Sequence, residues 1–244
     1  MARRSDKKQQ KRLSVKKAVR TDRKSSTWIV KTSPGANPKE LSVALSFLLR
    51  DILGLAKTMK EAKALLNSGK IKVNGKARKD TNFAIGLFDV IEFEKEGKNH
   101  FYRILIDYKG RIIASEVKDG KDLVKICKVS DKRIIKGKKV QLTTSDGIVL
   151  REPKEDANVN DSLKIKFPEK KVLEVIKMKK DNVAYLTSGK NAGKVAKIMD
   201  ISEGTIKREK LVTLDDNGKK IMTVITKAIV VGKGKPEIEL GVEE

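Results

Sequence analysis

The stretch from residue 58 to residue 80, TMKEAKALLNSGKIKVNGKARKD, restricts the fold more than any other part of the sequence. Thr58 and Glu61 have the spacing of a helix capping box, and Gly69 is placed to end that helix. Apolar and polar residues then alternate up to Asn74-Gly75, the dipeptide most typical of a tight β-hairpin. The stretch therefore predicts a helix followed directly by a hairpin, which is a small α+β unit.

Positive side chains crowd this helix and hairpin. From Lys57 to Lys79 there are eight Lys or Arg residues and one acid, Glu61. Such a run is usually a solvated face, but here the acids that normally intersperse it are missing. We therefore expect a nucleic-acid contact surface, because phosphates would relieve the mutual repulsion. Its candidate RNA-binding residues are Lys60, Lys63, Lys70, Lys72, Lys76, Arg78 and Lys79.

The whole chain repeats this imbalance. Its 244 residues carry 56 Lys or Arg against 32 Asp or Glu, a formal net charge of +24. Of the 56, 44 are lysines, which suit phosphates better than base edges. The composition thus favours a polyanionic partner bound through its backbone. No apolar run is long enough to span a bilayer, and no apolar segment follows the basic N-terminus, so we expect neither a membrane span nor a secretory signal.

Residues 1–36 form a basic N-terminal arm. Residues 1–39 hold 13 Lys or Arg and two Asp, with no sustained apolar period, so a disordered tail is the plain alternative. The stretch Trp28-Ile29-Val30 favours docking of the arm's end, because a lone Trp rarely sits in a solvated tail. The candidate RNA contacts of the arm are Arg3, Arg4, Lys11, Arg12 and Trp28.

A first helix is predicted just after the arm. Asn37 is expected to cap it, with Pro38 in the first turn, Glu40 three residues after the cap, and Gly54 at the end. From about residue 97 the pattern changes to short alternating strands separated by turns. One segment, DLVKICKV at residues 122–129, is compatible with either helix or strand. The final stretch, PEIELGVEE, reverses the sign of the charge.

Near the C-terminus, two alternating strands flank a loop at residues 188–194. Gly193 would let the backbone take a positive φ or approach a ligand closely. A glycine-lysine loop is often an ordinary turn, but in this basic chain RNA contact is the better hypothesis. The candidate residues are Lys190, Asn191, Gly193 and Lys194.

Little in the sequence points to catalysis. Cys127 and His100 are single, so we expect no disulfide, no metal site and no cofactor, and Cys127 reads as a small buried hydrophobe. The loop GKNAGK is not a phosphate-binding Walker loop, because Val195 stands where Ser or Thr would close it. These residues predict no enzyme. They also predict no small-molecule substrate.

Residues 44–93, with EAKALLNSGKIKVNGK at their centre, resemble the alpha-L RNA-binding module of ribosomal proteins, tRNA synthetases and pseudouridine synthases. Downstream, YRILIDYKGRIIA, KICKV, QLTTSDGIVLR and VNDSLKI resemble the eS4 family of archaeal and eukaryotic small-subunit ribosomal proteins. VAYLTSGKNAGKVAKI resembles the KOW motif that ends that family. No proline follows Lys11-Arg12-Leu13 before Trp28, so an insertion sits in the arm relative to the family.

The resemblance implies an α+β, multidomain fold. Its parts are a basic arm (1–36), an alpha-L module (37–95), a central β domain (96–171), a five-stranded SH3-like KOW barrel (172–235) and an acidic tail (236–244). It implies a cytoplasmic, structural constituent of the small ribosomal subunit that binds ribosomal RNA beside neighbouring ribosomal proteins, with the arm threaded along RNA. Two alternatives share these modules: an RNA-modifying enzyme, and a free RNA-binding or transcription factor. The long basic arm favours a permanently assembled protein over a cycling factor.

Overall fold

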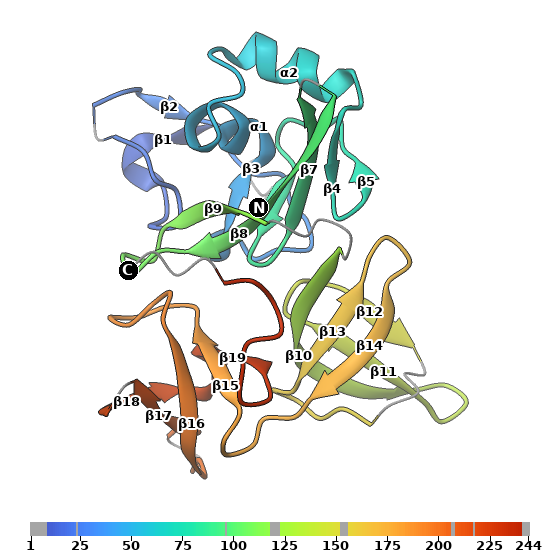
Figure 1. Ribbon diagram of the computed structural model, residues 1–244, viewed down its shortest axis with the longest axis vertical. Helices are drawn as coiled ribbons and strands as arrows, with labels where there is room; N and C mark the ends of the chain where they lie inside the picture. Colours follow the sequence, from blue (N-terminus) through green and yellow to red (C-terminus); the bar gives the residue numbers. More distant parts are fainter. Residues whose placement is uncertain are drawn as a thin grey trace, which may run out of the picture.

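The computed structural model describes residues 9–22, 24–95, 97–117, 123–151, 156–205, 208–216 and 218–240. Within these residues the protein is mostly β, with few helices and several sheets. The fold therefore contains both helices and strands, as an α+β class implies, but strands make up most of its regular structure. Figure 1 shows an upper body built by the first half of the chain and two lower bodies, one from residues 124–176 and one from residues 183–232.

The upper body contains a five-stranded antiparallel sheet with strand order β5-β4-β7-β8-β9. Its strands are β4 (Ile71–Val73), β5 (Lys76–Ala77), β7 (Val90–Lys95), β8 (Lys98–Ile106) and β9 (Ile112–Glu116). The hairpin predicted at Asn74-Gly75 is confirmed, with both turn residues at positive φ (51° and 73°). The domain boundary expected between residues 95 and 96 falls inside the β7–β8 hairpin, so residues 98–116 share a sheet with the basic hairpin.

The capped helix is also confirmed as α2 (Met59–Asn67). The N–H of Glu61 donates to Thr58 Oγ1 at 3.2 Å, and the Glu61 carboxylate accepts from the N–H of Lys57 at 2.8 Å. These contacts satisfy amides that the first helical turn leaves without partners, and the bond from Lys57 lowers the pKa of Glu61. Ala62 and Leu66 face the core.

The first helix begins later than predicted. Residues Lys39–Leu41 form a 3-10 turn (η2), residues Ser42–Ala44 form strand β3, and helix starts only at α1 (Leu45–Phe47), continued by a π-helical turn η3 (Leu48–Ile52). The Asn37 cap prediction is wrong, because β3 pairs with β6 (Ala84–Gly86) and the Asn37 amide donates to Ala84 O. A long-range strand pairing has replaced the local capping signal.

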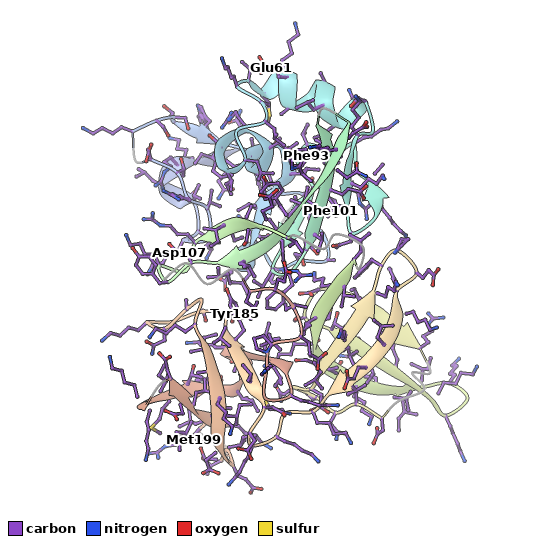
Figure 2. All side chains as sticks on the ribbon, in the orientation of Figure 1. Glu61, Phe93, Phe101, Asp107, Tyr185 and Met199 are labelled. Atoms are coloured by element: carbon purple, nitrogen blue, oxygen red, sulfur yellow. The ribbon has the colours of Figure 1, made fainter. Side chains whose placement is uncertain are left out.

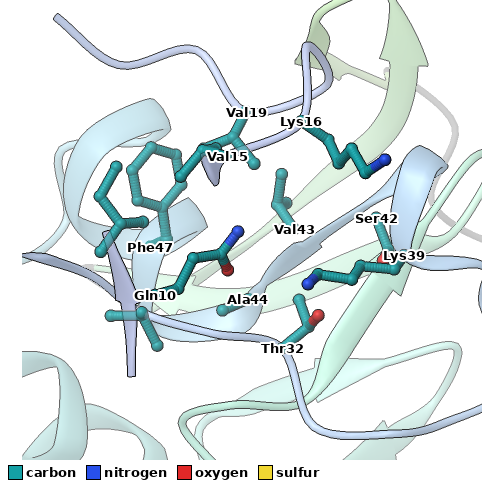
Figure 3. A pocket seen from close by; sticks show the side chains of 12 residues that line it. Gln10, Val15, Lys16, Val19, Thr32, Lys39, Ser42, Val43, Ala44 and Phe47 are labelled. Atoms are coloured by element: carbon teal, nitrogen blue, oxygen red, sulfur yellow. The ribbon is translucent and has the colours of Figure 1, made fainter. Parts of the chain in front are cut away.

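The described part of the arm packs onto the upper body. Strand β1 (Gln10–Lys11) pairs with β2 (Trp28–Ile29), and a 3-10 turn η1 (Arg12–Ser14) follows β1. Ala18 and Ile29 are buried, and Figure 3 shows Val15 and Val19 beside Phe47 and Val43. The cavity left there is about 10 Å³, hardly enough for one water molecule. From Gln9 onward the arm therefore has a packed core contact, although Arg3 and Arg4 lie outside the described residues.

The first lower body is a five-stranded sheet with strand order β12-β11-β10-β13-β14. Its strands are β10 (Val124–Ile135), β11 (Lys139–Thr144), β12 (Val149–Arg151), β13 (Ser162–Lys166) and β14 (Lys171–Ile176). The ambiguous segment at residues 122–129 is thus strand from Val124 onward, and Cys127 is fully buried as predicted. The boundary expected at residues 171/172 falls at the start of β14.

The second lower body is a five-stranded sheet with strand order β18-β17-β16-β15-β19. Its strands are β15 (Val183–Leu186), β16 (Val195–Ser202), β17 (Leu211–Asp216), β18 (Lys219–Val224) and β19 (Ala228–Gly232), with a 3-10 turn η4 (Ile225–Lys227) before the last. The strand pairs expected around the 188–194 loop and around residues 217–218 are confirmed, although Asn217 itself lies outside the described residues.

The three bodies share buried contacts. Phe88 of the upper body meets Tyr185 of β15 edge to face, with ring centroids 5.3 Å apart. The Tyr185 hydroxyl donates to Ile106 O and accepts from Ile106 N, both at 2.9 Å. Burial raises the pKa of Tyr185 to about 12, so the hydroxyl keeps its proton for this bond. The bodies are therefore packed against one another rather than strung on open linkers.

The C-terminal segment runs along the junction of all three bodies, as Figure 1 shows for the red trace after β19. Its Glu237 N–H donates to Val231 O at 3.0 Å, and its Glu237 carboxylate pairs with Lys164 of β13 at 3.0 Å. Arg103 of β8 donates to Glu239 O at 3.3 Å, and Ile238 is only 6% exposed. Residues 236–240 of the acidic tail are therefore part of the fold, whereas Glu243 and Glu244 lie outside the described residues.

Among the described residues, no helix is both long enough and apolar enough to cross a bilayer.

Candidate nucleic-acid interface

Five of the lysines predicted to bind RNA on the helix and hairpin are exposed and make no ion pair with the described part of the chain. We call this group the module lysines: Lys60, Lys63, Lys70, Lys76 and Lys79. Helix α2 holds the first two about one turn apart, and the third comes between the helix and the hairpin. The fourth lies in hairpin strand β5, and the fifth follows that strand. Since none pairs with an acid among the described residues, their positive potential acts on the solvent side, where an anionic partner would meet it.

Two predicted residues of the same cluster have partners within the protein. The Lys72 ammonium pairs with the Glu92 carboxylate of β7 at 3.0 Å. The Arg78 guanidinium lies over the Phe83 ring, 4.6 Å from its centroid. Both side chains are half-buried, so the structure gives them a stabilising role that the sequence pattern did not distinguish.

The tip of the basic hairpin faces the first lower body. A Cβ placed on Gly75 would lie 3.1 Å from Leu123 and 3.4 Å from Pro168. The Asn74 amide donates to Asp89 at 2.7 Å and its oxygen accepts from the Val90 N–H at 2.9 Å. The turn is therefore fixed between two bodies, whereas Lys76 beside it is exposed.

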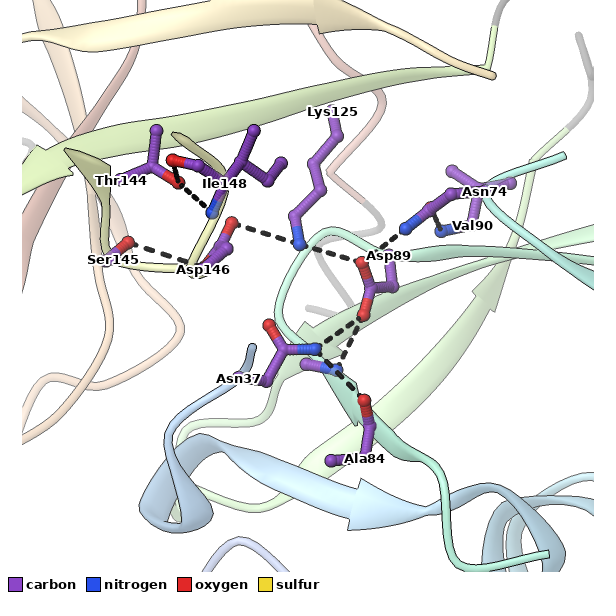
Figure 4. A network of polar contacts seen from close by, with 11 residues as sticks. Asn37, Asn74, Ala84, Asp89, Val90, Lys125, Thr144, Ser145, Asp146 and Ile148 are labelled. Atoms are coloured by element: carbon purple, nitrogen blue, oxygen red, sulfur yellow. Dashed lines mark hydrogen bonds and ion pairs between the residues drawn. The ribbon is translucent and has the colours of Figure 1, made fainter. Parts of the chain in front are cut away.

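Asp89 is the centre of the polar junction beneath this turn (Figure 4). Its carboxylate accepts from Asn37 at 3.1 Å, from Asn74 at 2.7 Å and from the Gly86 N–H at 2.7 Å. It also pairs with the Lys125 ammonium at 2.7 Å, and Lys125 in turn reaches Asp146 at 3.0 Å. Burial alone would lower the pKa of Lys125, but the two carboxylates outweigh it and raise that pKa. The junction thus joins the upper body to the first lower body through a lysine that stays protonated.

A second buried lysine joins the two lower bodies. Lys128 of β10 donates to Ile225 O at 2.6 Å and to Ala228 O at 2.9 Å. Burial lowers the pKa of Lys128 to about 8. Neither Lys125 nor Lys128 is exposed, so these two cations hold the bodies together and do not belong to the exposed basic surface.

The loop at residues 188–194 places its predicted residues differently from one another. Lys190 is exposed and Asn191 half-buried, and both line a cleft of about 280 Å³ with Met222 and Lys227. Lys194 is exposed but pairs with Asp216 at 2.6 Å. Of the two lysines of this predicted site, Lys190 is therefore the one without an ion pair to the described part of the chain.

Gly193 is needed for contact within the protein. Its φ is +78°, and a Cβ there would lie 2.5 Å from Ile106 O and 3.0 Å from the Asp107 backbone. Ala192 beside it is fully buried. The predicted close approach of backbone at Gly193 exists, but the chain that it approaches is the β8–β9 turn.

The arm residues predicted to bind RNA also make internal contacts. Lys11 lies over the Trp28 ring, 5.6 Å from its centroid, and Trp28 is 52% exposed. Docking of the arm is achieved by Ile29, which is 8% exposed, and not by Trp28. Arg12 donates to Thr21 O at 2.7 Å and to Asp22 O at 3.2 Å, which closes the loop of the arm.

Sequence reasoning missed the basic residues Lys109 and Arg111 in the β8–β9 turn. They line a cleft of about 420 Å³ together with Arg12, Lys16 and Lys17 of the arm. In the sequence, residues 107–110 indicate only a turn, because the arm is some ninety residues away along the chain. Only the packing of Val15, Ala18 and Val19 onto the upper body brings the two sets of cations together.

The described residues contain no group of three or more His, Cys, Asp or Glu side chains placed to hold a metal ion. Burial raises the pKa of Cys127 well above its usual value, so this thiol stays protonated and unreactive. His100 stacks on Phe93 and lies 3.4 Å from the Glu116 carboxylate.

Comparison with known proteins gives two family matches. The model of the ribosomal family S4e matches residues 98–172, and the model of the S4 domain matches residues 48–91, which include all the module lysines. The small ribosomal subunit protein eS4 of Archaeoglobus fulgidus is 40% identical, over 96% of this chain and 98% of its own length. The protein of the same name from Methanocaldococcus jannaschii is 35% identical, over 98% of this chain and all of its own.

A solved structure is similar as well. The crystal structure of the 30S ribosomal protein S4e from Thermoplasma acidophilum has a TM-score of 0.68 and 29% sequence identity. The match covers 79% of this chain and 96% of that one. The fold and the full-length sequence similarity thus point to the same proteins.

Proposed function

Because this chain belongs to the ribosomal S4e family, we propose that it is a structural constituent of the small ribosomal subunit that binds ribosomal RNA. The proposal rests on the agreement between a sequence match and the positions of exposed lysines. The region matched by the S4 domain holds the module lysines, and these are exposed without counter-charges among the described residues. The sequence resemblance to an RNA-binding module and the geometry therefore select the same surface.

The mechanism is electrostatic and geometric. Lysine side chains neutralise phosphates, while the packed bodies fix where neighbouring RNA segments lie. The proposed contacts are the module lysines, then Lys190 with Asn191 in the 188–194 loop, and Lys11 with Trp28 in the arm. Arg3 and Arg4 extend this list as predictions from sequence alone. The proposed partners are small-subunit ribosomal RNA and adjacent ribosomal proteins in the cytoplasm.

The finer domain assignment is part of the proposal. We infer that the second lower body is the SH3-like KOW barrel, since it has five antiparallel strands and two of them, β15 and β16, flank the 188–194 loop. We assign no catalytic role. An RNA-modifying enzyme would need a catalytic domain after the module, and the region there, residues 98–172, matches the S4e family instead.

The test is co-sedimentation from the source organism. Tagged chain in a clarified lysate is expected to travel with the small subunit through a sucrose gradient and to stay there after a moderate salt wash. The isolated protein on extracted small-subunit RNA is expected to lose roughly 10³–10⁵ in affinity between 50 and 200 mM salt, if it engages about 6–10 phosphates. Chain that stays at the top of the gradient, or RNA binding independent of salt, contradicts the proposal.

A further inference from the structure

The cleft between the arm and the β8–β9 turn has a one-sided composition. Five of its eight lining residues are Lys or Arg, and none of the eight is acidic. The arm contributes Arg12, Lys16 and Lys17, and the turn contributes Lys109 and Arg111. At about 420 Å³ the cleft lies in the size range of ligand sites. A folded chain gathers five like charges around one hollow at a cost in repulsion, unless an anion fills it.

Most of this positive charge is not neutralised internally. Lys17 and Arg111 are exposed, and their side chains make no hydrogen bond or ion pair with the described part of the chain. Lys16 has one partner, Glu40, at 3.4 Å. Arg12 uses two of its N–H groups on Thr21 and Asp22, which leaves three of the five donors of a guanidinium.

The walls of the cleft are held in place by the fold. The Ile112 N–H of β9 donates to Ala18 O of the arm at 2.8 Å. The Asp107 N–H donates to Arg111 O at 2.7 Å, which closes the turn that carries Lys109. The cations are thus presented on a preorganised surface, which lowers the entropy lost on binding.

The cleft adjoins the 188–194 loop. Gly193 packs against Ile106 and Asp107, and a Cβ on Gly110 would lie 4.0 Å from the Cβ of Ala192. Figure 2 labels Asp107 and Tyr185 at this junction of the upper and lower bodies. The β8–β9 turn is therefore shared: one side lines the cleft, and the other supports the loop that presents Lys190.

An exposed aromatic ring stands at the same turn. Tyr108 is 65% exposed, and Lys109 lies over its ring, 5.0 Å from the centroid. Single-stranded RNA is bound by cationic grooves combined with aromatic side chains on which bases stack. A protein partner would bring carboxylates to such a cleft, but it has no bases to stack on the exposed Tyr108 ring.

From these contacts we propose that the cleft binds the sugar–phosphate backbone of a ribosomal RNA strand, and that the same strand continues across Tyr108 to the 188–194 loop. The proposal deepens the function proposed above and rests on it. It adds Lys16, Lys17, Tyr108, Lys109 and Arg111 to the RNA-binding residues, and it joins the arm and the loop into one continuous track.

Two matched hairpin turns make a controlled test. Lys109-Gly110-Arg111 has a counterpart in Lys136-Gly137-Lys138 at the tip of the β10–β11 hairpin, which carries the same charge and has exposed side chains. The variant Lys109→Glu/Arg111→Glu is expected to weaken binding to extracted small-subunit RNA at least tenfold at 100 mM salt. It should also reduce the slope of log affinity against log salt by about 1.5, the loss of roughly two phosphate contacts.

The control variant Lys136→Glu/Lys138→Glu makes the same change in net charge. It is expected to alter affinity less than threefold and to leave the slope unchanged. Equal effects of the two variants would mean that only bulk charge matters, and would overturn the proposal. Tyr108→Ala should weaken binding roughly tenfold without changing the slope, because stacking releases no counterions.

Tethered cleavage locates the strand. Cys127 is fully buried, so a cysteine introduced by Lys17→Cys, Lys109→Cys or Lys190→Cys can be labelled selectively with iron–EDTA. Labels at positions 17 and 109 are expected to cut one and the same RNA segment, with cuts from position 190 displaced along that strand. Cuts from 17 and 109 in unrelated segments, or no cuts, would rule out the cleft.

The outcome separates this inference from the proposed function. If Lys60→Glu/Lys63→Glu weakens RNA binding but Lys109→Glu/Arg111→Glu does not, the inference fails and the proposed function stands. If the unmodified chain does not bind the RNA at all, the proposed function fails with it. Circular dichroism and melting temperature of every variant confirm that each one is folded.

Discussion

Asp89 shows how one buried residue can organise the relation between two bodies. It is 2% exposed and accepts hydrogen bonds from Asn37, from Asn74 of the basic hairpin, from the Gly86 N–H of β6 and from Lys125 of the first lower body. A buried carboxylate of this kind is tolerated because donors of the protein replace the hydrogen bonds that it would otherwise make to water.

Loss of this carboxylate should be costly. Asp89→Ala leaves the Lys125 charge buried beside Asp146 alone, so we expect the free energy of unfolding to fall by about 3–5 kcal/mol. Adding Lys125→Met should restore only part of the loss, because it removes the buried ammonium but leaves Asp146 without its partner. Urea denaturation of the two single variants and the double variant measures the coupling.

Asp200→Ala is the control for this cycle. Asp200 pairs with Lys180 at 2.7 Å on the exposed surface, where solvent screens such pairs and they contribute little to stability. If Asp89→Ala destabilises no more than Asp200→Ala, the polar junction is not what joins the bodies.

At the level of elements, the sequence was informative where the signals are local. Helix α2 and its hairpin follow from a capping box and an Asn-Gly turn, whose partners lie within a few residues. Asn37 failed as a cap because its side chain bonds to Asp89, 52 residues away. The cleft at Lys109 was invisible for the same reason, since the arm that completes it packs there through Val15, Ala18 and Val19.

The candidate site was predicted in the same uneven way. Spacing identified the module lysines as one basic surface, but it could not separate them from Lys72, whose partner Glu92 lies on another strand. Likewise, the loop sequence indicated a close backbone approach at Gly193 without showing that the approaching chain is Ile106. Tertiary pairing decides both cases, and periodicity does not encode it.

The two classes of lysine on this module can be separated by experiment. Lys60→Glu/Lys63→Glu/Lys70→Glu should weaken RNA binding by at least tenfold and leave the melting temperature within about 2 °C, because exposed substitutions change stability little. Lys72→Glu should instead lower the melting temperature, since it places a carboxylate against Glu92. Filter binding and thermal denaturation of both variants provide the comparison. A matching loss of stability in the triple variant would show that those lysines are structural.

On the scale of the whole molecule, three β bodies are joined by a few buried links. Lys125 joins the upper body to the first lower body, and Lys128 joins the two lower bodies. Tyr185 joins the second lower body to strand β8 of the upper body. Residues 236–240 cross all three boundaries. The acidic tail thus acts as a bracket inside an otherwise basic protein.

Disruption of this bracket should uncouple the bodies. Ile238 is 6% exposed, and Ile238→Asp would bury a carboxylate among apolar side chains. We expect it to destabilise the protein by several kcal/mol and to split a single unfolding transition into two, because the sheets keep their own strand pairing. Met222→Asp, at a 68% exposed site in the same body, should keep one transition. Calorimetry distinguishes the two, and a single unshifted transition in Ile238→Asp would show that the segment is not a bracket.

The position of this segment in the chain has a consequence for biogenesis. Residues 236–240 are translated after every strand that they contact, so each sheet can form during synthesis while the mutual orientation of the sheets stays open until the last contacts are made. The contacts of residues 236–240 would then be the step that fixes the mutual orientation of sheets that have already formed.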